Sequence, residues 1–254
     1  MAAAGGAAAA LMNAAPVNMP ETGCAGAIEA RLRALADAAR ATSMQAYLLD
    51  QFPFLGLPAP VRRAAVRDLL IQPVAGPEAL LAMAEQLWRL PEREFRYTAI
   101  DLLRQHRRHL QIAHLAAIER LILRDPWWET VDGLANVVGA VVRHEMQGGP
   151  AAQATMDAWV RHPSLWVRRV AMLHQLGWRM ATDQERLGRY ATLLAPEQDF
   201  FIKKAIGWAL RDYARWNPEF VSAFVVDKQA ILSRLTVREA CRRIATSAQA
   251  AQLP

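Results

Sequence analysis

The residues best suited to chemistry are an indole and a carboxylate, Trp128 and Asp132, within the segment Trp127-Trp128-Glu129-Thr130-Val131-Asp132. Residues four apart lie on the same face of a helix, so the two side chains are expected to project together. An aromatic ring beside a carboxylate suits a flat or positively charged group. Two plainer explanations compete: the tryptophans fill a core, and Asp132 is a solvated or helix-capping acid.

The charge of the chain indicates a negatively charged partner. The formal net charge is +6 and the pI is about 9.9, values that make nucleic acid the first candidate. Only three of the 30 basic residues are lysines. Such an excess of arginine also arises from codon bias, but arginine is the better ligand for phosphate. The balance therefore favours nucleic acid.

The remaining composition indicates a cytoplasmic protein. The two cysteines, Cys24 and Cys241, lie near opposite ends of the chain, which argues against a disulfide scaffold and fits a reducing compartment. Residues 1–26 are mostly Ala and Gly without Lys or Arg, so we expect a disordered tail rather than a targeting signal. Apolar runs are too short to span a membrane, so no membrane partner is expected.

The segments that must position these residues are predicted to be helices. Ile28–Ala41 and Leu110–Leu123 carry apolar residues three and four positions apart, the period of a helix. Proline and glycine separate such segments along the whole chain. We therefore predict an all-α fold.

A repeat is visible when the starts of the expected helices are aligned. An apolar residue, basic or polar residues and a small Ala recur about every 35 residues. They occur in Val61-Arg62-Arg63-Ala64, Phe95-Arg96-Tyr97-Thr98-Ala99, Val131-Asp132-Gly133-Leu134-Ala135, Trp166-Val167-Arg168-Arg169-Val170-Ala171, Phe201-Ile202-Lys203-Lys204-Ala205 and Val237-Arg238-Glu239-Ala240. This pattern predicts an α-solenoid of helix pairs, with the basic residues on one concave face.

Patterns for metal or cofactor binding are weak. His106, His109 and His114 are close in sequence, but no cysteine or carboxylate completes a zinc-like set. Gly-rich phosphate loops and nucleophile elbows are missing as well. We therefore expect surface histidines and a protein that works without metal or organic cofactor.

Several separated motifs resemble the bacterial DNA alkylation repair enzymes built from HEAT-like repeats. The resemblance covers roughly Met44 to Ile244, in the expected order. It is carried by Gln51-Phe52-Pro53-Phe54-Leu55-Gly56, Pro60-Val61-Arg62-Arg63, Trp127-Trp128-Glu129-Thr130-Val131-Asp132, Trp166-Val167-Arg168-Arg169, Phe200-Phe201-Ile202-Lys203-Lys204-Ala205-Ile206-Gly207-Trp208-Ala209-Leu210-Arg211-Asp212-Tyr213, Asn217-Pro218 and Arg238-Glu239-Ala240. It implies a single domain over residues 27–250, a right-handed solenoid of HEAT-like helix pairs with a concave basic groove.

The resemblance also implies an activity. The family's enzymes are DNA glycosylases that excise N3- and N7-alkylated purines from double-stranded DNA, so base excision repair by a monomer is expected. The family's cleft residues correspond to Trp128, Asp132 and Trp208, with Arg169 on the DNA backbone. Relatives lacking the acid are expected to bind DNA without cutting the glycosidic bond. Glu129 departs from the family pattern, which usually has Asp there.

Further DNA contacts are expected around these positions. Lys203, Lys204 and Arg211 are near Trp208 in sequence, and the last two fall on its helix face. Arg168 and Arg169 are adjacent, so one is expected to form an ion pair while the other reaches phosphate. Likewise only one of two adjacent tryptophans can face the cleft, and Trp127 is assigned to the core. A DNA-binding relative without excision activity and a protein-binding scaffold remain as alternatives.

Overall fold

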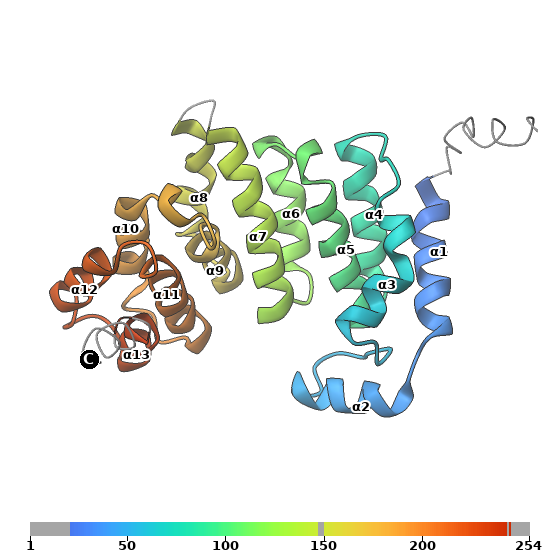
Figure 1. Ribbon diagram of the computed structural model, residues 1–254, viewed down its shortest axis with the longest axis horizontal. Helices are drawn as coiled ribbons and strands as arrows, with labels where there is room; N and C mark the ends of the chain where they lie inside the picture. The colour runs from blue at the N-terminus through green and yellow to red at the C-terminus, as the bar shows by residue number, and fades with distance from the viewer. Residues whose placement is uncertain (1–20, 147–149, 243, 245–254) are drawn as a thin grey trace, which may run out of the picture.

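The computed structural model describes residues 21–146, 150–242 and 244, and every regular element in these ranges is a helix (Figure 1). The α-helices are α1 (Glu21–Ala34), α2 (Ala38–Tyr47), α3 (Ala59–Leu70), α4 (Pro77–Arg89), α5 (Arg93–Gln105), α6 (Leu115–Leu123), α7 (Trp128–Glu145), α8 (Ala154–Trp159), α9 (Leu165–Leu173), α10 (Gln184–Leu194), α11 (Phe200–Tyr213), α12 (Pro218–Asp227) and α13 (Arg234–Cys241). Short 3-10 helices are η1 (Arg107–His109), η2 (Ile112–His114), η4 (Pro150–Gln153) and η5 (Arg179–Ala181). The all-α prediction is confirmed.

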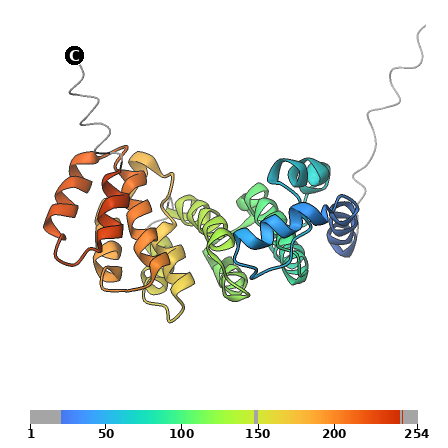
Figure 2. The same cartoon turned by 90° about the horizontal axis from the view of Figure 1, so that it is seen from below.

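The helices follow one another along an elongated array, as a solenoid requires (Figure 1). Alternate helices form a continuous row: α3 packs on α5, α5 on α7, α7 on α9, α9 on α11 and α11 on α13. The six repeated segments fall in these same six helices. Helix α2 is the exception, because it runs across the ends of its neighbours instead of joining the row (Figure 2).

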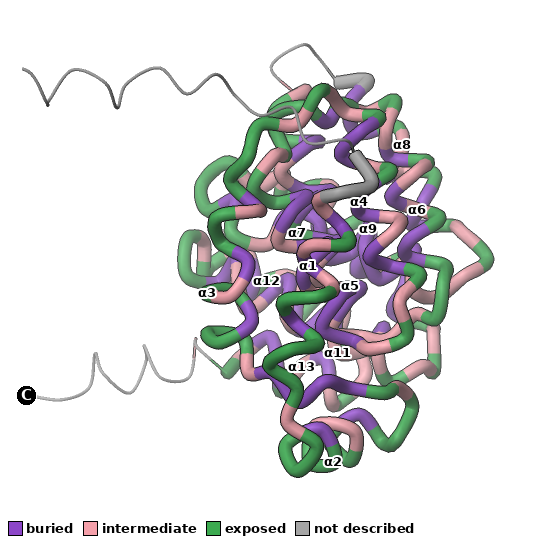
Figure 3. The backbone as a smooth tube through the Cα atoms, turned by 90° about the vertical axis from the view of Figure 1, so that its right-hand side faces the viewer, coloured by how far each residue is buried: buried purple, intermediate pink, exposed green. Residues whose placement is uncertain are grey.

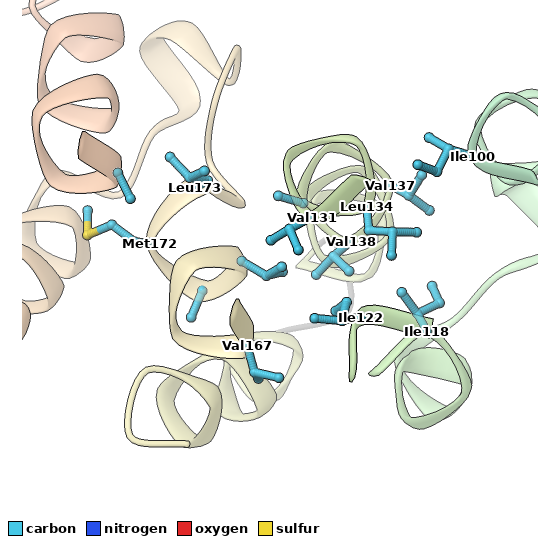
Figure 4. Packing of buried hydrophobic residues seen from close by; sticks show 14 of the residues in the cluster. Ile100, Ile118, Ile122, Val131, Leu134, Val137, Val138, Val167, Met172 and Leu173 are labelled. Atoms are coloured by element: carbon cyan, nitrogen blue, oxygen red, sulfur yellow. The ribbon is translucent and has the colours of Figure 1, made fainter. Parts of the chain in front are cut away.

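Apolar side chains between the layers form one long core. Figure 3 shows buried segments running through the interior, while α2 is largely exposed. In the middle of the array, Val131, Leu134 and Val138 of α7 lie between α6 and α9 (Figure 4). Their helical spacing buries one face of α7, and the first two turns of this helix carry Trp128 and Asp132. In the described ranges we find no helix long and apolar enough to cross a membrane.

Two expectations about the N-terminal region need correction. Helix α1 begins at Glu21, so the expectation of a disordered tail over residues 1–26 is wrong for residues 21–26, and residues 1–20 lie outside the described ranges. Ile28–Ala41 is not one helix, because α1 ends at Ala34 and α2 begins at Ala38. The carboxylate of Asp37 accepts a hydrogen bond from the backbone N–H of Arg40 and so starts a new helix.

A buried carboxylate fixes the loop that follows α2. Both oxygens of Glu94, on α5, accept hydrogen bonds from the backbone N–H groups of Leu55, Gly56 and Leu57 at 2.9–3.0 Å. Gly56 has φ of +85°, and a Cβ there would lie 2.1 Å from the carbonyl oxygen of Asp37. Only glycine allows this approach, so the loop and Glu94 together hold α2 beside the start of α7.

Candidate active site

Trp128 and Asp132 both belong to the first part of α7. Trp127 precedes the helix with an extended backbone (φ −149°, ψ 160°), and Trp128 is the first helical residue. Trp128 and Asp132 are each half-buried. The predicted placement of the pair one turn apart on a single helix is thus confirmed, although the roles of the two side chains stay predictions.

The carboxylate of Asp132 forms a two-pronged ion pair with Arg169 of α9. Nε and Nη2 of the guanidinium donate to the two carboxylate oxygens at 2.7 and 2.8 Å, and Nη1 donates to the backbone carbonyl of Phe201. Arg169 is only 1% exposed. Asp132 is therefore a half-buried, ion-paired acid rather than a freely solvated or capping one, and Arg169 holds the carboxylate in one orientation.

Two opposing effects act on the pKa of Asp132. Burial raises the pKa of this carboxyl above its usual value, and the Arg169 guanidinium opposes the rise. The nearby Glu129 carboxylate adds a further increase. The net direction is upward, so Asp132 takes up a proton more readily than a solvated aspartate.

Trp208, half-buried on α11, is surrounded by cations. The ring centroid lies 5.3 Å from Cζ of Arg169, 5.5 Å from Nζ of Lys204 and 5.9 Å from Cζ of Arg211. Lys204 and Arg211 share one carboxylate, that of Glu239 on α13, at 2.7 and 2.8 Å. The helix-face argument therefore placed Lys204 and Arg211 correctly, and the structure joins Trp208 to Asp132 through Arg169.

Helix α2 contributes an aromatic residue that sequence reasoning missed. The ring of Tyr47 meets Trp128 edge-on, with centroids 6.2 Å apart, and Tyr47 is 72% exposed. Nothing in its helix spacing singles it out, and only its position just before the Gln51-Phe52-Pro53-Phe54 motif gave a signal. The hollow next to it has a volume of about 340 Å³ and is lined by Ser43, Met44, Tyr47, Leu48, Phe54, Tyr97 and Glu129.

Glu129, the departure from the family pattern, is tied to α5. Its Oε1 accepts hydrogen bonds from Nε of Arg93 at 2.6 Å and from the hydroxyl of Tyr97 at 3.3 Å. Arg93 is fully buried and also donates to the hydroxyl of Thr130. Glu129 therefore anchors the first turn of α7 to the preceding repeat.

Trp127 does not lie in the core as expected. It is half-buried at the edge of a small hydrophobic core, within an aromatic cluster in which its ring centroid lies 5.9 Å from Trp166 and 5.3 Å from Phe201. The reason is that Trp127 lies outside the helix, so the 100° spacing of helical neighbours does not apply to it. Its cluster packs the start of α7 against α9 and α11.

Of Arg168 and Arg169, one was expected to form an ion pair and the other to reach DNA phosphate, and the structure shows both in ion pairs. Arg168 is paired with both carboxylate oxygens of Glu197 at 2.8 and 2.7 Å and also donates to backbone carbonyls of His162 and Pro163. Arg169 is buried against Asp132. Both guanidinium groups thus connect helices. Lys203 is less constrained, because among the described residues its ammonium donates to the neutral Gln198 side chain alone, at 2.9 Å.

Ion pairs between successive repeats explain much of the recurring charge. Basic and acidic residues of the row of alternate helices meet across four of its five junctions, at 2.6–2.7 Å in Arg62–Asp101, Arg93–Glu129, Arg169–Asp132 and Lys204–Glu239. These side chains are largely buried, so their charges stabilise stacking and are offset by partners. The predicted concave positive surface must therefore depend on other basic residues.

The described ranges contain no group of three or more His, Cys, Asp or Glu side chains placed to hold a metal ion. Of the three histidines noted in the sequence, His114 and His106 are half-buried rather than solvated surface residues, and Nε2 of His106 lies 2.8 Å from the carbonyl oxygen of Leu70. His106 therefore joins the end of α5 to α3.

Comparison with known proteins identifies the family of the chain. Residues 28–244 match the sequence family described as DNA alkylation repair enzyme. The chain is also similar to a solved structure titled as a predicted DNA alkylation repair enzyme from Enterococcus faecalis, with 31% identity and a TM-score of 0.74 over 81% of this chain and 95% of that one. A comparison with curated proteins finds no match. The chain therefore belongs to the DNA alkylation repair enzyme family.

Proposed function

We propose that the protein is a DNA glycosylase that excises N3- and N7-alkylated purines from double-stranded DNA in bacterial base excision repair. The observation that carries this proposal is the Asp132 carboxylate, held by Arg169 beside Trp208 and one helical turn from Trp128. In this proposal the protein acts in the cytoplasm, without metal or cofactor. It acts as a monomer, because a groove for duplex DNA must stay open.

The chemistry follows from the charge of the substrate. Alkylation at N3 or N7 makes the purine cationic and weakens its glycosidic bond, and cleavage passes through an oxocarbenium-like sugar. The role of Asp132 is to stabilise this positive charge and to orient the attacking water. Arg169 keeps the carboxylate oriented and opposes the rise in its pKa that burial causes, which favours the ionised form.

The aromatic residues contribute to the binding of the cationic base. A cation over a tryptophan face gains about 0.5–2 kcal/mol. Since about 1.4 kcal/mol changes a rate tenfold, Trp128 and Trp208 supply modest acceleration. This is enough for a base that already leaves readily, and it predicts poor activity on neutral, undamaged bases. Tyr47, exposed at the edge of Trp128, is positioned to extend the same surface.

Binding of the DNA backbone is assigned to the basic side chains near the site. Lys203, Lys204 and Arg211 are half-buried rather than buried and retain donors for phosphate oxygens. Arg168 and Arg169 would have to leave their carboxylate partners first. We therefore assign Arg169 primarily to positioning Asp132.

The test is direct. The protein is incubated with methylated duplex DNA, and released 7-methylguanine and 3-methyladenine are quantified against the spontaneous rate. Release well above that rate supports the proposal. Release at the spontaneous rate, with DNA still bound, overturns it.

One observation favours a second candidate, a DNA-binding relative that does not cut. Both oxygens of Asp132 are engaged by Arg169, as in a purely structural ion pair. DNA binding at low salt without base release would support this candidate. Absence of DNA binding at low salt would leave a protein-binding scaffold.

A further inference from the structure

The carboxylate of Glu239 lies at the centre of the cations around Trp208. Its two oxygens accept hydrogen bonds from Nζ of Lys204 at 2.7 Å and from Nη1 of Arg211 at 2.8 Å. Each of these cations is within 6 Å of the Trp208 ring centroid. Glu239 is only 7% exposed, so it acts on the site through these two partners.

The backbone holds Glu239 in this position. A Cβ at Gly207 would lie 2.6 Å from Cβ of Glu239, so α11 and α13 approach as closely as a glycine permits. The hydroxyl of Thr236 donates to the carbonyl of Lys203 at 3.1 Å and ties the same two helices together. Glu239 therefore has little freedom to follow Lys204 or Arg211 elsewhere.

Glu239 offsets part of the positive charge around Trp208. Arg169, Lys204 and Arg211 are cations, and Asp132 and Glu239 are the carboxylates paired with them. The hydrogen bond from Lys204 holds the pKa of Glu239 below its usual value, so the carboxylate is ionised at neutral pH. Without the Glu239 carboxylate, these three cations would be opposed by the Asp132 carboxylate alone and would repel a positively charged base.

We propose that Glu239 is a specificity-determining residue that holds Lys204 and Arg211 beside Trp208 and offsets their charge, so that a cationic base can approach the ring. The inference rests on the proposed glycosylase function. It assigns to the last helix of the solenoid a part in selecting the substrate, through a residue that touches neither the base nor the sugar.

The decisive variant is Glu239→Gln, which keeps the shape of the side chain and removes its charge. We expect the kcat for 7-methylguanine release to fall about tenfold, since a repelled cationic base is harder to bring to the ring. Lys204 and Arg211 become free for phosphate, so binding to undamaged duplex DNA tightens. Its dependence on salt steepens by up to about one unit of slope per freed cation.

A loss of fold would also lower base release, and two further variants separate the cases. Glu197→Gln is the matched control, because it frees Arg168 from an equivalent ion pair away from Trp208 and is expected to leave base release unchanged. The double variant Lys204→Gln, Glu239→Gln removes one charge of each sign. It is expected to recover much of the lost activity if charge balance is the cause. Thermal melting of each variant checks the fold.

The inference is overturned if Glu239→Gln releases 7-methylguanine at the wild-type rate, or if the double variant recovers nothing while melting as the wild type does. In both cases an active wild type leaves the proposed function standing. A wild type that releases no base overturns the proposed function and the specificity role together. The experiment therefore distinguishes failure of the Glu239 role from failure of the proposed glycosylase function.

Discussion

The candidate site consists of paired side chains rather than one exposed acid. Asp132 is held by Arg169, and Arg169 lies under Trp208, so the acid, the cation and the indole form one connected group. Burial of both partners makes the pair sensitive to loss of either charge. Activity, stability and pH dependence should therefore all respond to substitutions in this pair.

Replacing Asp132 with Asn is expected to preserve DNA binding and to lower base release by about 10²–10³-fold, as loss of an electrostatic stabiliser does. The amide also leaves Arg169 without a charged partner, so the free energy of unfolding falls by about 1–3 kcal/mol. Base release, DNA binding and thermal melting are measured together.

Asp101→Asn is the matched control, because Asp101 pairs with the buried Arg62 at the α3–α5 junction. It is expected to lose similar stability without losing activity. Equal base release by Asp132→Asn and wild type would exclude Asp132 as the key acid.

Base release should also depend on pH in a way set by Arg169. Because burial raises the pKa of Asp132, activity is lost at a pH higher than the ordinary aspartate value of 3.8 as the carboxylate takes up a proton. Arg169→Gln removes the opposing guanidinium, so the acid limb of the kcat/KM profile moves to still higher pH. Arg62→Gln removes a comparable buried arginine and is expected to leave the limb in place. An unmoved limb in Arg169→Gln would show that another group controls it.

At the scale of elements, hydrogen bonds and ion pairs between helices and loops hold α2 and α7 in the positions that form the site. Helix α2 faces Trp128 because Glu94 holds the loop after it and Gly56 permits its close approach. The first turn of α7 is tied to α5 through Glu129 and Arg93. Similar ties connect α8 to α10, where Asp157 accepts hydrogen bonds from Arg186, Arg189 and Tyr190.

The Asp157 cluster gives a pH dependence of stability. Partial burial acts to raise the pKa of Asp157, but hydrogen bonds from Arg186 and Tyr190 outweigh it and lower the pKa to about 2. The ionised carboxylate therefore stabilises the fold above about pH 4, and this contribution is lost as pH falls towards 2. Asp157→Asn is expected to be less stable at pH 7 and to lose less stability between pH 4 and 2.

The measurement is urea unfolding of wild type and variant at several pH values. Asp227→Asn is a suitable control, because Asp227 is exposed and, within the described ranges, its ion-pair partner is the adjacent Lys228 alone. Parallel pH curves for wild type and Asp157→Asn would contradict the prediction.

At the scale of the whole molecule, the site depends on how α7 and α9 stack in the middle of the solenoid. A Cβ at Gly139 would lie 1.9 Å from the backbone carbonyl oxygen of His174, so the two helices meet almost backbone to backbone. The same contact sets the distance between Asp132 on α7 and Arg169 on α9. Stacking in a repeat protein is therefore coupled to the geometry of the site.

Gly139→Ala tests this coupling. The added methyl group meets backbone atoms that cannot rotate away, so we expect a loss of about 1–3 kcal/mol or more in the free energy of unfolding. Base release is expected to fall as well, because α9 must shift relative to α7. Chemical denaturation and base release are the measurements.

Gly26→Ala is the control, since a Cβ there has no neighbour within 4 Å in helix α1. Alanine is the better helix former, so this change is expected to be neutral or slightly stabilising. Full stability of Gly139→Ala would show that the α7–α9 contact tolerates a shift.

The sequence by itself determined the helical repeats and the chemistry-bearing residues. Periodic apolar residues and regularly spaced Ala specify amphipathic helices locally, so the amino-acid pattern alone was enough to assign the six repeated segments to helices. The pairing of Trp128 with Asp132 could be predicted for the same reason, since spacing on one helix depends on local geometry. Trp208 was named through the family resemblance, and spacing then placed Lys204 and Arg211 on its helix face.

Only the tertiary structure decided which of these charges meet. Arg169 pairs with Asp132 and Lys204 with Glu239 across 37 and 35 residues, and Tyr47 reaches Trp128 from a helix outside the repeat row. Such contacts depend on how neighbouring helices stack, which helical periodicity does not encode. The basic residues that looked like open phosphate ligands in sequence are for this reason largely partners in ion pairs between repeats.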